Sequence, residues 1–170
     1  MIDESDHQQM GAALAEARST QDIYAAVGIV LARRFNFIAL TFLVLSNDRN
    51  WSNRVWSSNT VEYPSPDRRR FTATDEAAEC FRHGRPFLAN DHAALRANFP
   101  HAYEIIQRLG IDFGANVPVV ALGRSLGKVT LSGDRASFRP DLMDAIATVT
   151  PYLVLPFARD ADALSAAAGG

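Results

Sequence analysis

Residues 111–133 read IDFGANVPVVALGRSLGKVTLSG, and this stretch predicts the β-hairpin around which the rest of the fold is arranged. Residues 116–122 are mostly apolar and include three β-branched valines, as is typical of a strand. Gly and Ser in residues 123–125 supply turn chemistry, and residues 126–132 form the return strand. The stretch therefore predicts two neighbouring antiparallel strands.

Both predicted strands separate polar from apolar side chains, because successive side chains point to opposite faces of a sheet. On the return strand Val129 and Leu131 share one face. The opposite face carries Lys128, Thr130 and Ser132. On the outgoing strand Asn116 lies opposite the face shared by Val117, Val119 and Ala121. We therefore expect helices against the apolar face and a binding cavity against the polar face.

Composition limits the class of protein. The chain has 170 residues, of which 48% are hydrophobic, which suits one domain with a sizeable core. A formal charge of −2 argues against nucleic acid or an anionic membrane as a partner. The sequence has no apolar run of membrane-spanning length and no signal-peptide pattern at its start. A single cysteine excludes an intrachain disulfide, so we expect a cytoplasmic protein.

Two helices are predicted before the first strand. Residues 1–18 form a weakly amphipathic N-terminal extension that carries Met10 and Leu14. Ser19 and Asp22 have the spacing of a capping box, so a second helix begins there. Its apolar stripe consists of Ile23, Val27, Val30 and Leu31. Met10 and Leu14 suit either the protein's own sheet or a second subunit, and we predict a homodimer through the terminal helices.

The next segments predict a central strand and its partner. Residues 36–46 are apolar on both faces, and residues 51–58 pair with them after a polar turn. Residues 59–70 contain two prolines and the run Asp-Arg-Arg-Arg, so we expect a loop. The arginines could hold a phosphate, but a solvated loop is the favoured interpretation.

The second half alternates short helices with extended segments. Thr74 is the expected N-cap of a helix that ends at Gly84 and turns Cys80 inward as an inert thiol. After Gly84 a short extended segment is predicted over residues 85–90. Further helices are predicted over residues 91–97 and 101–109. The last helix begins at residue 141, is bent by Pro151, and ends in a disordered tail, residues 161–170.

Three motifs in this order resemble those of the GAF domain family. Residues 83–91, HGRPFLAND, are similar to its glycine, basic, proline, strand and aspartate pattern. Residues 116–129 resemble its final hairpin, and residues 138–142, FRPDL, resemble the entry to its last helix. Residues 55–64 also look like those of small stand-alone members. The resemblance covers residues 19–157.

The resemblance implies an α+β fold with a GAF/PAS-like central antiparallel sheet of five to six strands. Terminal helices would cover one face, and loops and short helices would enclose a pocket on the other. The expected organisation is an N-terminal extension over residues 1–18, a GAF domain over 19–160 and a tail over 161–170. Because no effector domain is evident in the sequence, such a sensory or regulatory module would act on an effector protein in trans.

Several specific chemistries of the family are disfavoured. The Asn-Lys pair of cyclic-GMP-binding relatives is missing from the last strand, and Cys80 lacks the following histidine typical of bilin attachment. Reduction of free methionine sulfoxide in this fold uses several cysteines, and the single cysteine of this chain cannot complete that cycle. His101 and Glu104 lie one helical turn apart and could serve a metal or acid–base site, which we rank low. The sequence names neither a ligand nor a cofactor.

The resemblance and the polar faces together predict which residues bind an unidentified small molecule. The expected aromatic walls are Trp56, Tyr63 and Phe99. The expected orienting groups are Thr41, Ser58, Asn59, Asn116, Thr130, His101 and Glu104. We predict a regulatory module without enzymatic activity. The alternatives are a partner-binding subunit with a vestigial pocket and, less favoured, an enzyme that uses His101 and Glu104.

Overall fold

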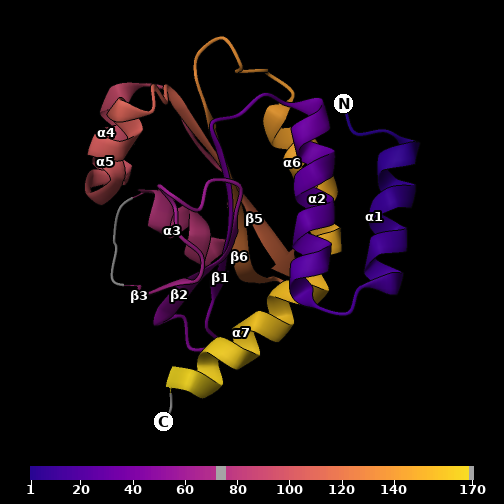
Figure 1. The fold of residues 1–170 in the computed structure, drawn as a ribbon. Helices are drawn as coiled ribbons and strands as arrows, with labels where there is room; N and C mark the ends of the chain where they lie inside the picture. Colours follow the sequence, from indigo (N-terminus) through magenta and orange to yellow (C-terminus); the bar gives the residue numbers. More distant parts are fainter. Residues whose placement is uncertain (72–75, 169–170) are drawn as a thin grey trace.

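The structure, a computed structural model, describes residues 1–71 and 76–168. Over these residues the strands form one antiparallel six-stranded sheet in the order β3-β2-β1-β6-β5-β4 (Figure 1). The strands are β1 Ala39–Leu45, β2 Trp51–Ser57, β3 Asp67–Arg70, β4 Phe87–Ala89, β5 Phe113–Ala121 and β6 Arg124–Gly133. The predicted hairpin is β5–β6, and β6 lies beside β1 at the centre of the sheet. The predicted antiparallel α+β fold is confirmed.

Helices cover both faces of the sheet (Figure 1). One face carries α1 Glu4–Glu16, α2 Thr20–Arg34, α6 Leu142–Val149, η2 Thr150–Leu153 and α7 Val154–Ala168. The other face carries α3 Glu76–His83, α4 His92–Asn98, η1 Pro100–Ala102 and α5 Tyr103–Arg108. The terminal helices therefore share one face, as predicted, and the short helices lie over the other.

The main core lies between the sheet and the terminal helices. Phe42 of β1 is fully buried and contacts Tyr24 of α2 and Phe157 of α7, with ring centroids 5.6 and 6.4 Å away. The Tyr24 hydroxyl donates a hydrogen bond of 2.7 Å to Asp160 of α7. Burial, together with that carboxylate, raises the pKa of Tyr24. These contacts join α2, α7 and the central strand into one unit.

Local signals read from the sequence account for the helix boundaries. The capping box of α2 is confirmed, because Ser19 Oγ accepts from the Asp22 amide and Asp22 accepts from the Ser19 amide. Pro151 falls in η2, which separates α6 from α7 as the predicted bend. Asp91 caps α4 by accepting a hydrogen bond of 2.7 Å from the Ala94 amide.

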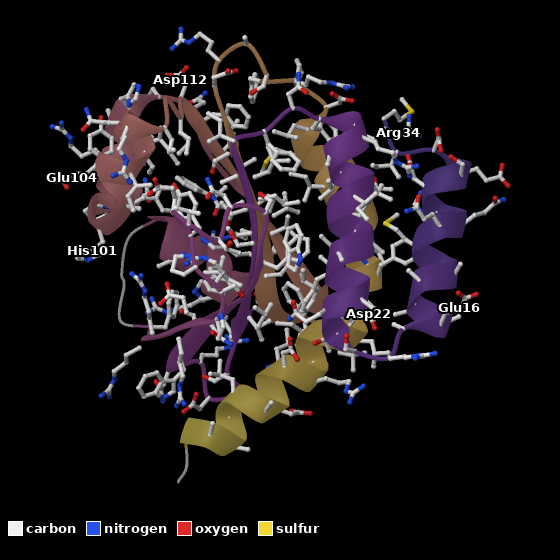
Figure 2. The ribbon with its side chains drawn as sticks, viewed as in Figure 1. Glu16, Asp22, Arg34, His101, Glu104 and Asp112 are labelled. Atoms are coloured by element: carbon white, nitrogen blue, oxygen red, sulfur yellow. The ribbon has the colours of Figure 1, made fainter. Side chains whose placement is uncertain are left out.

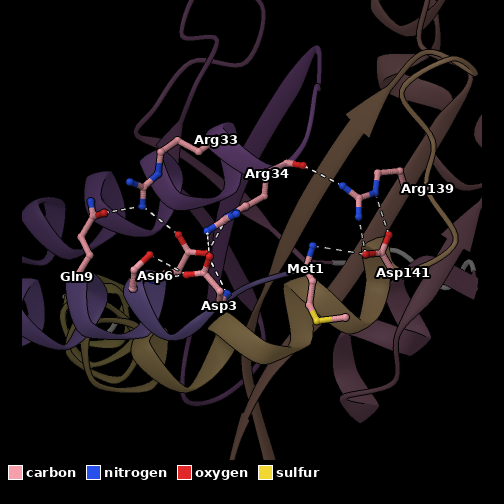
Figure 3. A network of polar contacts seen from close by, with 9 residues as sticks. Met1, Asp3, Asp6, Gln9, Arg33, Arg34, Arg139 and Asp141 are labelled. Carbon is pink, nitrogen blue, oxygen red and sulfur yellow. Dashed lines mark hydrogen bonds and ion pairs between the residues drawn. The ribbon is translucent and has the colours of Figure 1, made fainter.

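An ion-pair network attaches α1 to α2 (Figure 3). Asp6 is fully buried and accepts hydrogen bonds of 3.0 Å from Arg33 and 2.7 Å from Arg34. Arg34 also pairs with Asp3, the N-cap of α1. Met10 is 1% exposed and belongs to the main core. Met10 is therefore buried within the protomer. It is not available for contact with a second subunit, although the homodimer prediction was based on Met10 and Leu14.

Three sequence-based boundaries are corrected by the structure. The β5–β6 turn consists of two residues, Leu122 and Gly123, both with positive φ, which matches the twist of the strands. Residues 59–70 contain a strand, β3, whose Asp67 forms an ion pair with Arg54 of the neighbouring strand. The predicted disordered tail continues α7 to Ala168, because Leu164 is buried and α7 packs on β1 and β2.

Two predictions fall outside the residues that the structure describes. Thr74, the expected N-cap of α3, lies in the undescribed segment 72–75. The side chain of Cys80 is not among those described either, so its predicted inertness stays a prediction.

Candidate ligand-binding site

A cavity of about 150 Å³ lies between the sheet and the short helices α4, η1 and α5. Its floor is built by side chains that alternation along β1 and β6 brings to one face. Thr41 and Leu43 of β1 pair with Thr130 and Lys128 of β6, and all four line the cavity. The intervening Phe42 and Val129 are buried in the main core on the other face. This confirms the predicted separation of the two faces of the hairpin.

The lid is apolar and is contributed by the irregular segment before β5. Leu95 and Phe99 of the α4 region, Ala102 of η1 and Ile106 of α5 line the cavity from above. Leu95 and Ile106 are buried, so the lid packs as a small second core. Gly114 of β5 lies beneath it, where an added Cβ would lie 3.6 Å from Leu95 and 3.9 Å from Phe99. The lid therefore lies close to the hairpin.

Asn116 organises the polar part of the floor. It is 3% exposed, and its Oδ1 accepts hydrogen bonds of 2.9 Å from both Lys128 Nζ and Thr130 Oγ1. Its Nδ2 donates to the Gly114 carbonyl at 3.3 Å. The Lys128 ammonium lies 5.2 Å from the ring centroid of Phe81 and 5.7 Å from that of Phe99, a cation–π arrangement. One buried amide thus fixes an ammonium and a hydroxyl at the cavity.

Arg54 brings a second cation to the cavity from β2. Its Nη1 donates to Asp67 at 3.0 Å and to the Pro64 carbonyl at 2.9 Å, which fixes the guanidinium plane. Desolvation lowers the pKa of Arg54, and the Asp67 carboxylate opposes that effect. The guanidinium carbon lies 5.6 Å from the centroid of the Tyr63 ring, another lining residue, whose pKa is raised by burial. Arg54 Nε is buried without an acceptor among the described residues.

A β-bulge explains why Arg54, and not Trp56, faces the cavity. The register pairs Phe42 with Trp56 and Leu43 with Arg54, so Val55 is an extra residue. Trp56 is thereby turned to the helix face, where it stacks on Phe42 with centroids 4.9 Å apart. The prediction that Trp56 forms a cavity wall is wrong, because it assumed unbroken alternation along β2.

Ser58 and Asn59 also lie outside the cavity, because they organise the chain after β2. Ser58 is exposed, and its Oγ accepts a hydrogen bond of 2.9 Å from the Leu40 amide. Asn59 Oδ1 accepts from the Glu62 amide at 3.2 Å. Ser58 thus joins the end of β2 to β1, and Asn59 stabilises the turn that leads to Tyr63.

His101 and Glu104 are exposed, and neither lines the cavity. Figure 2 shows both side chains on the outer side of the lid. The lid buries Ala102 and Ile106 toward the cavity instead, so the helix is rotated relative to the prediction. The structure therefore does not bring His101 and Glu104 to a common site at the cavity.

Four of the predicted residues do line the cavity: Thr41, Tyr63, Phe99 and Thr130. A fifth, Asn116, contacts two lining residues from below. The site prediction omitted Lys128, although its position on the polar face of the hairpin was a usable signal. It also omitted Arg54, because nothing in the sequence indicates the bulge that turns Arg54 toward the cavity.

None of the helices in residues 1–71 and 76–168 is both long and apolar enough to cross a membrane. In the same part of the chain, His, Cys, Asp and Glu side chains form no group of three that could hold a metal ion.

Comparison with known proteins defines the fold. The sequence matches no family model and no curated protein. The structure is similar to residues 122 to 287 of a methyl-accepting chemotaxis protein, with a TM-score of 0.67 and 16% identity over 92% of this chain and 98% of that one. It is also similar to the GAF domain of a phosphoenolpyruvate-protein phosphotransferase from Coxiella burnetii, with a TM-score of 0.68 and 14% identity over 91% of this chain and 92% of that one.

A third similar structure is the GAF domain of a two-component sensor histidine kinase from Bacillus halodurans. The TM-score is 0.65 and the identity 13%, over 84% of this chain and 96% of that one. These likenesses extend over 84–92% of this chain and 92–98% of the similar structures. The chain therefore has the GAF-domain fold.

Proposed function

We propose that this domain is a sensory or regulatory module that binds a small molecule in the cavity beneath α4, η1 and α5. The observation that carries the proposal is the cavity itself, where polar groups on rigid strands face an apolar lid. Ligand sites in proteins commonly combine apolar walls with a few placed polar groups. A volume of about 150 Å³ suits a molecule of the size of a substituted benzene.

The similar structures support a sensory role, since they come from a chemotaxis protein and a sensor histidine kinase. The central strand offers a route for the signal. Thr41 and Leu43 of β1 face the cavity, whereas Phe42 between them packs on α2 and α7. A ligand that shifts β1 would therefore move contacts with the terminal helices.

The proposed output is contact with an effector protein in trans, in a homodimer formed through the terminal helices. Ile29 of α2 and Leu155 of α7 are exposed apolar residues on these helices. Deletion of residues 1–18 is expected to weaken the dimer, measured by sedimentation at micromolar concentration.

The competing candidates make different predictions. A partner-binding subunit with a vestigial cavity would co-purify with one protein and would respond to no small molecule. An enzyme that uses His101 and Glu104 has little support, because both side chains are exposed on the outer side of the lid.

Native mass spectrometry of the freshly purified protein tests the proposal, together with a thermal-shift screen of metabolites. We expect a bound small-molecule mass, or a compound that raises the melting temperature in a saturable way. If no small molecule is bound and no compound in the screen stabilises the protein, the proposal is overturned and the vestigial cavity is favoured.

A further inference from the structure

We infer that the tip of the β5–β6 hairpin, residues 120–124, docks into a groove between α1, α2 and α7 of a second copy of this chain. The inference rests on the proposed homodimer and names the surfaces that form it. It depends on an unfavourable leucine at the tip, on the way the tip is held, and on an apolar groove at the same end of the molecule.

Leu122 is an unfavourable residue for the turn that it occupies. Its side chain is fully exposed, and its φ of 50° places its backbone in the left-handed region. That region is costly for a leucine, and Asn-Gly is the preferred pair in a two-residue turn of this kind. Val120, two residues earlier, is 41% exposed and adds a second apolar side chain. A strained residue that gains no burial within the protomer points to a contact made outside it.

The tip is held in a fixed position by the rest of the molecule. Arg124 Nη2 donates hydrogen bonds of 2.6 Å to the Asn47 carbonyl and 3.0 Å to Asn47 Oδ1. Asn47 in turn donates from its side chain to Asp162 at 2.8 Å and from its amide to Ser165 at 2.7 Å, both on α7. A surface that is fixed before its partner arrives loses little conformational entropy on binding.

The groove supplies an apolar hollow of about 70 Å³. Most of its lining is apolar, with Leu14 and Ala17 of α1, Ile23 of α2, and Leu155 and Pro156 of α7. Leu14 is half-buried and Leu155 is exposed, so the protomer itself leaves apolar surface open here. The volume is more than twice the share of one water molecule in the liquid, which suits a single aliphatic side chain.

The tip and the groove lie at the same end of the molecule. Gly127 of β6 lies directly against the ring of Phe157, and the groove residues Leu155 and Pro156 precede Phe157 in the chain. β5 contacts η2 and α7, and its arrowhead ends near the start of α7 (Figure 1). A two-fold axis at this end would place each tip in the groove of the other copy, which is a closed arrangement. Because Thr130 of the same β6 lines the cavity, one strand would connect the cavity to the dimer contact.

Sedimentation velocity of the full chain over the micromolar range measures the association. We expect Leu122→Asn and Leu155→Ser each to raise the dissociation constant at least about tenfold, because each removes an apolar side chain from both contacts of the dimer. Ile29→Ser is the matched control, since Ile29 is exposed on α2 but is not among the described residues that line the groove. It should leave the dissociation constant unchanged.

Loss of folding does not imitate this result, because Leu122→Asn should stabilise the protomer. Asparagine tolerates the left-handed region better than leucine, and with Gly123 it forms the preferred turn pair. At a dilution where wild type and variant are both monomeric, we expect the melting temperature to rise by about 2–4 °C.

A disulfide cross-link tests the pairing of tip and groove directly. Leu122→Cys and Ala17→Cys are made separately in a Cys80→Ser chain, so that each protein carries one thiol. When the two proteins are mixed and oxidised, we expect disulfide-linked dimers of mixed composition. Either protein alone should give much less cross-linked dimer.

The outcomes separate this inference from the proposed function. If the mixed disulfide does not form, or if Leu122→Asn and Leu155→Ser associate as wild type does, the inference is overturned and the proposed homodimer stands. A dimer weakened by Ile29→Ser and not by Leu122→Asn would place the contact on the helices alone. A wild-type protein that is monomeric throughout the micromolar range would overturn both the inference and the proposed homodimer, whereas ligand binding in the cavity would stand.

Discussion

Gly127 is the residue at which the sheet tolerates least change. A Cβ added there would lie 2.1 Å from the Leu43 carbonyl oxygen and 2.7 Å from the Phe157 ring. The carbonyl belongs to the backbone of the central strand and cannot move aside cheaply. We expect Gly127→Ala to lower the free energy of unfolding by at least about 3 kcal/mol, measured by urea unfolding.

Gly11 of α1 supplies the matched control for this substitution. An added Cβ there meets no atom within 4 Å, and the residue lies inside a helix. Gly11→Ala should therefore stabilise the protein by about 0.5–1 kcal/mol. Equal stability of the two variants would contradict the close approach of β6 to β1 and α7.

Alanine substitutions of Trp56 and His101 test whether either side chain contributes to the cavity. Trp56 packs on Phe42 and against Gly28, in the core beneath the terminal helices. We expect Trp56→Ala to cost about 3 kcal/mol while leaving the affinity for a cavity ligand nearly unchanged. His101→Ala should change stability by less than about 0.5 kcal/mol and should not alter binding. Loss of ligand binding in either variant, with the fold intact, would place the ligand elsewhere.

The polar and apolar faces of the hairpin could be predicted because alternation along β6 is unbroken. The same rule misplaced Trp56, because one extra residue in β2 changes which side chains face the cavity. The residues near Val55 do not predict a bulge, because the bulge arises from the pairing of β2 with β1. Regular alternation therefore accounts for the lining residues Thr41 and Thr130, whereas Trp56 lies beside the irregularity and faces the terminal helices.

At the scale of elements, the attachment of α1 to α2 depends on pH. The pKa of Asp3 is lowered to about 2 by the Ser5 hydroxyl, the Asp6 amide and Arg34. A folded pKa below the unfolded value of 3.8 means that the carboxylate stabilises the folded state above about pH 4. This contribution is lost as the pH falls from about 4 toward 2.

Asp3→Asn is the variant that isolates this charge, because asparagine is also a good N-cap. We expect the variant to unfold more easily than wild type near about pH 6 and equally easily near about pH 2. Urea midpoints at the two pH values measure the difference. A gap between the two proteins that is as wide in acid as at neutral pH would argue against the Asp3 carboxylate as the cause.

The starts of α2 and α4 could be predicted because caps are local signals, at Ser19 and Asp91. The strand β3 could not, because its sequence Asp-Arg-Arg-Arg has no apolar alternation. It is held by pairing with β2 and by the ion pair between Asp67 and Arg54. The end of α7 was missed for a similar reason, since the burial of Leu164 depends on a distant strand.

At the scale of the whole molecule, one sheet serves two layers of helices. The terminal helices share the main core with Phe42, and the short helices enclose the cavity over Thr41 and Leu43. The two layers are thus joined through alternate residues of a single strand. A sensory role requires such a connection between the ligand-binding cavity and the surface that contacts a partner protein.

The central claim is that a ligand binds in the cavity, and a blocked cavity tests it most directly. Ala102 lines the cavity from η1, so Ala102→Phe would place a ring in the ligand's space. Ala97 is exposed on the outer side of α4, so Ala97→Phe adds the same ring where no ligand should bind. Compounds that raise the melting temperature of wild type should act equally on Ala97→Phe and not on Ala102→Phe. Equal stabilisation of Ala102→Phe would show that the ligand binds outside the cavity, and the account would be wrong.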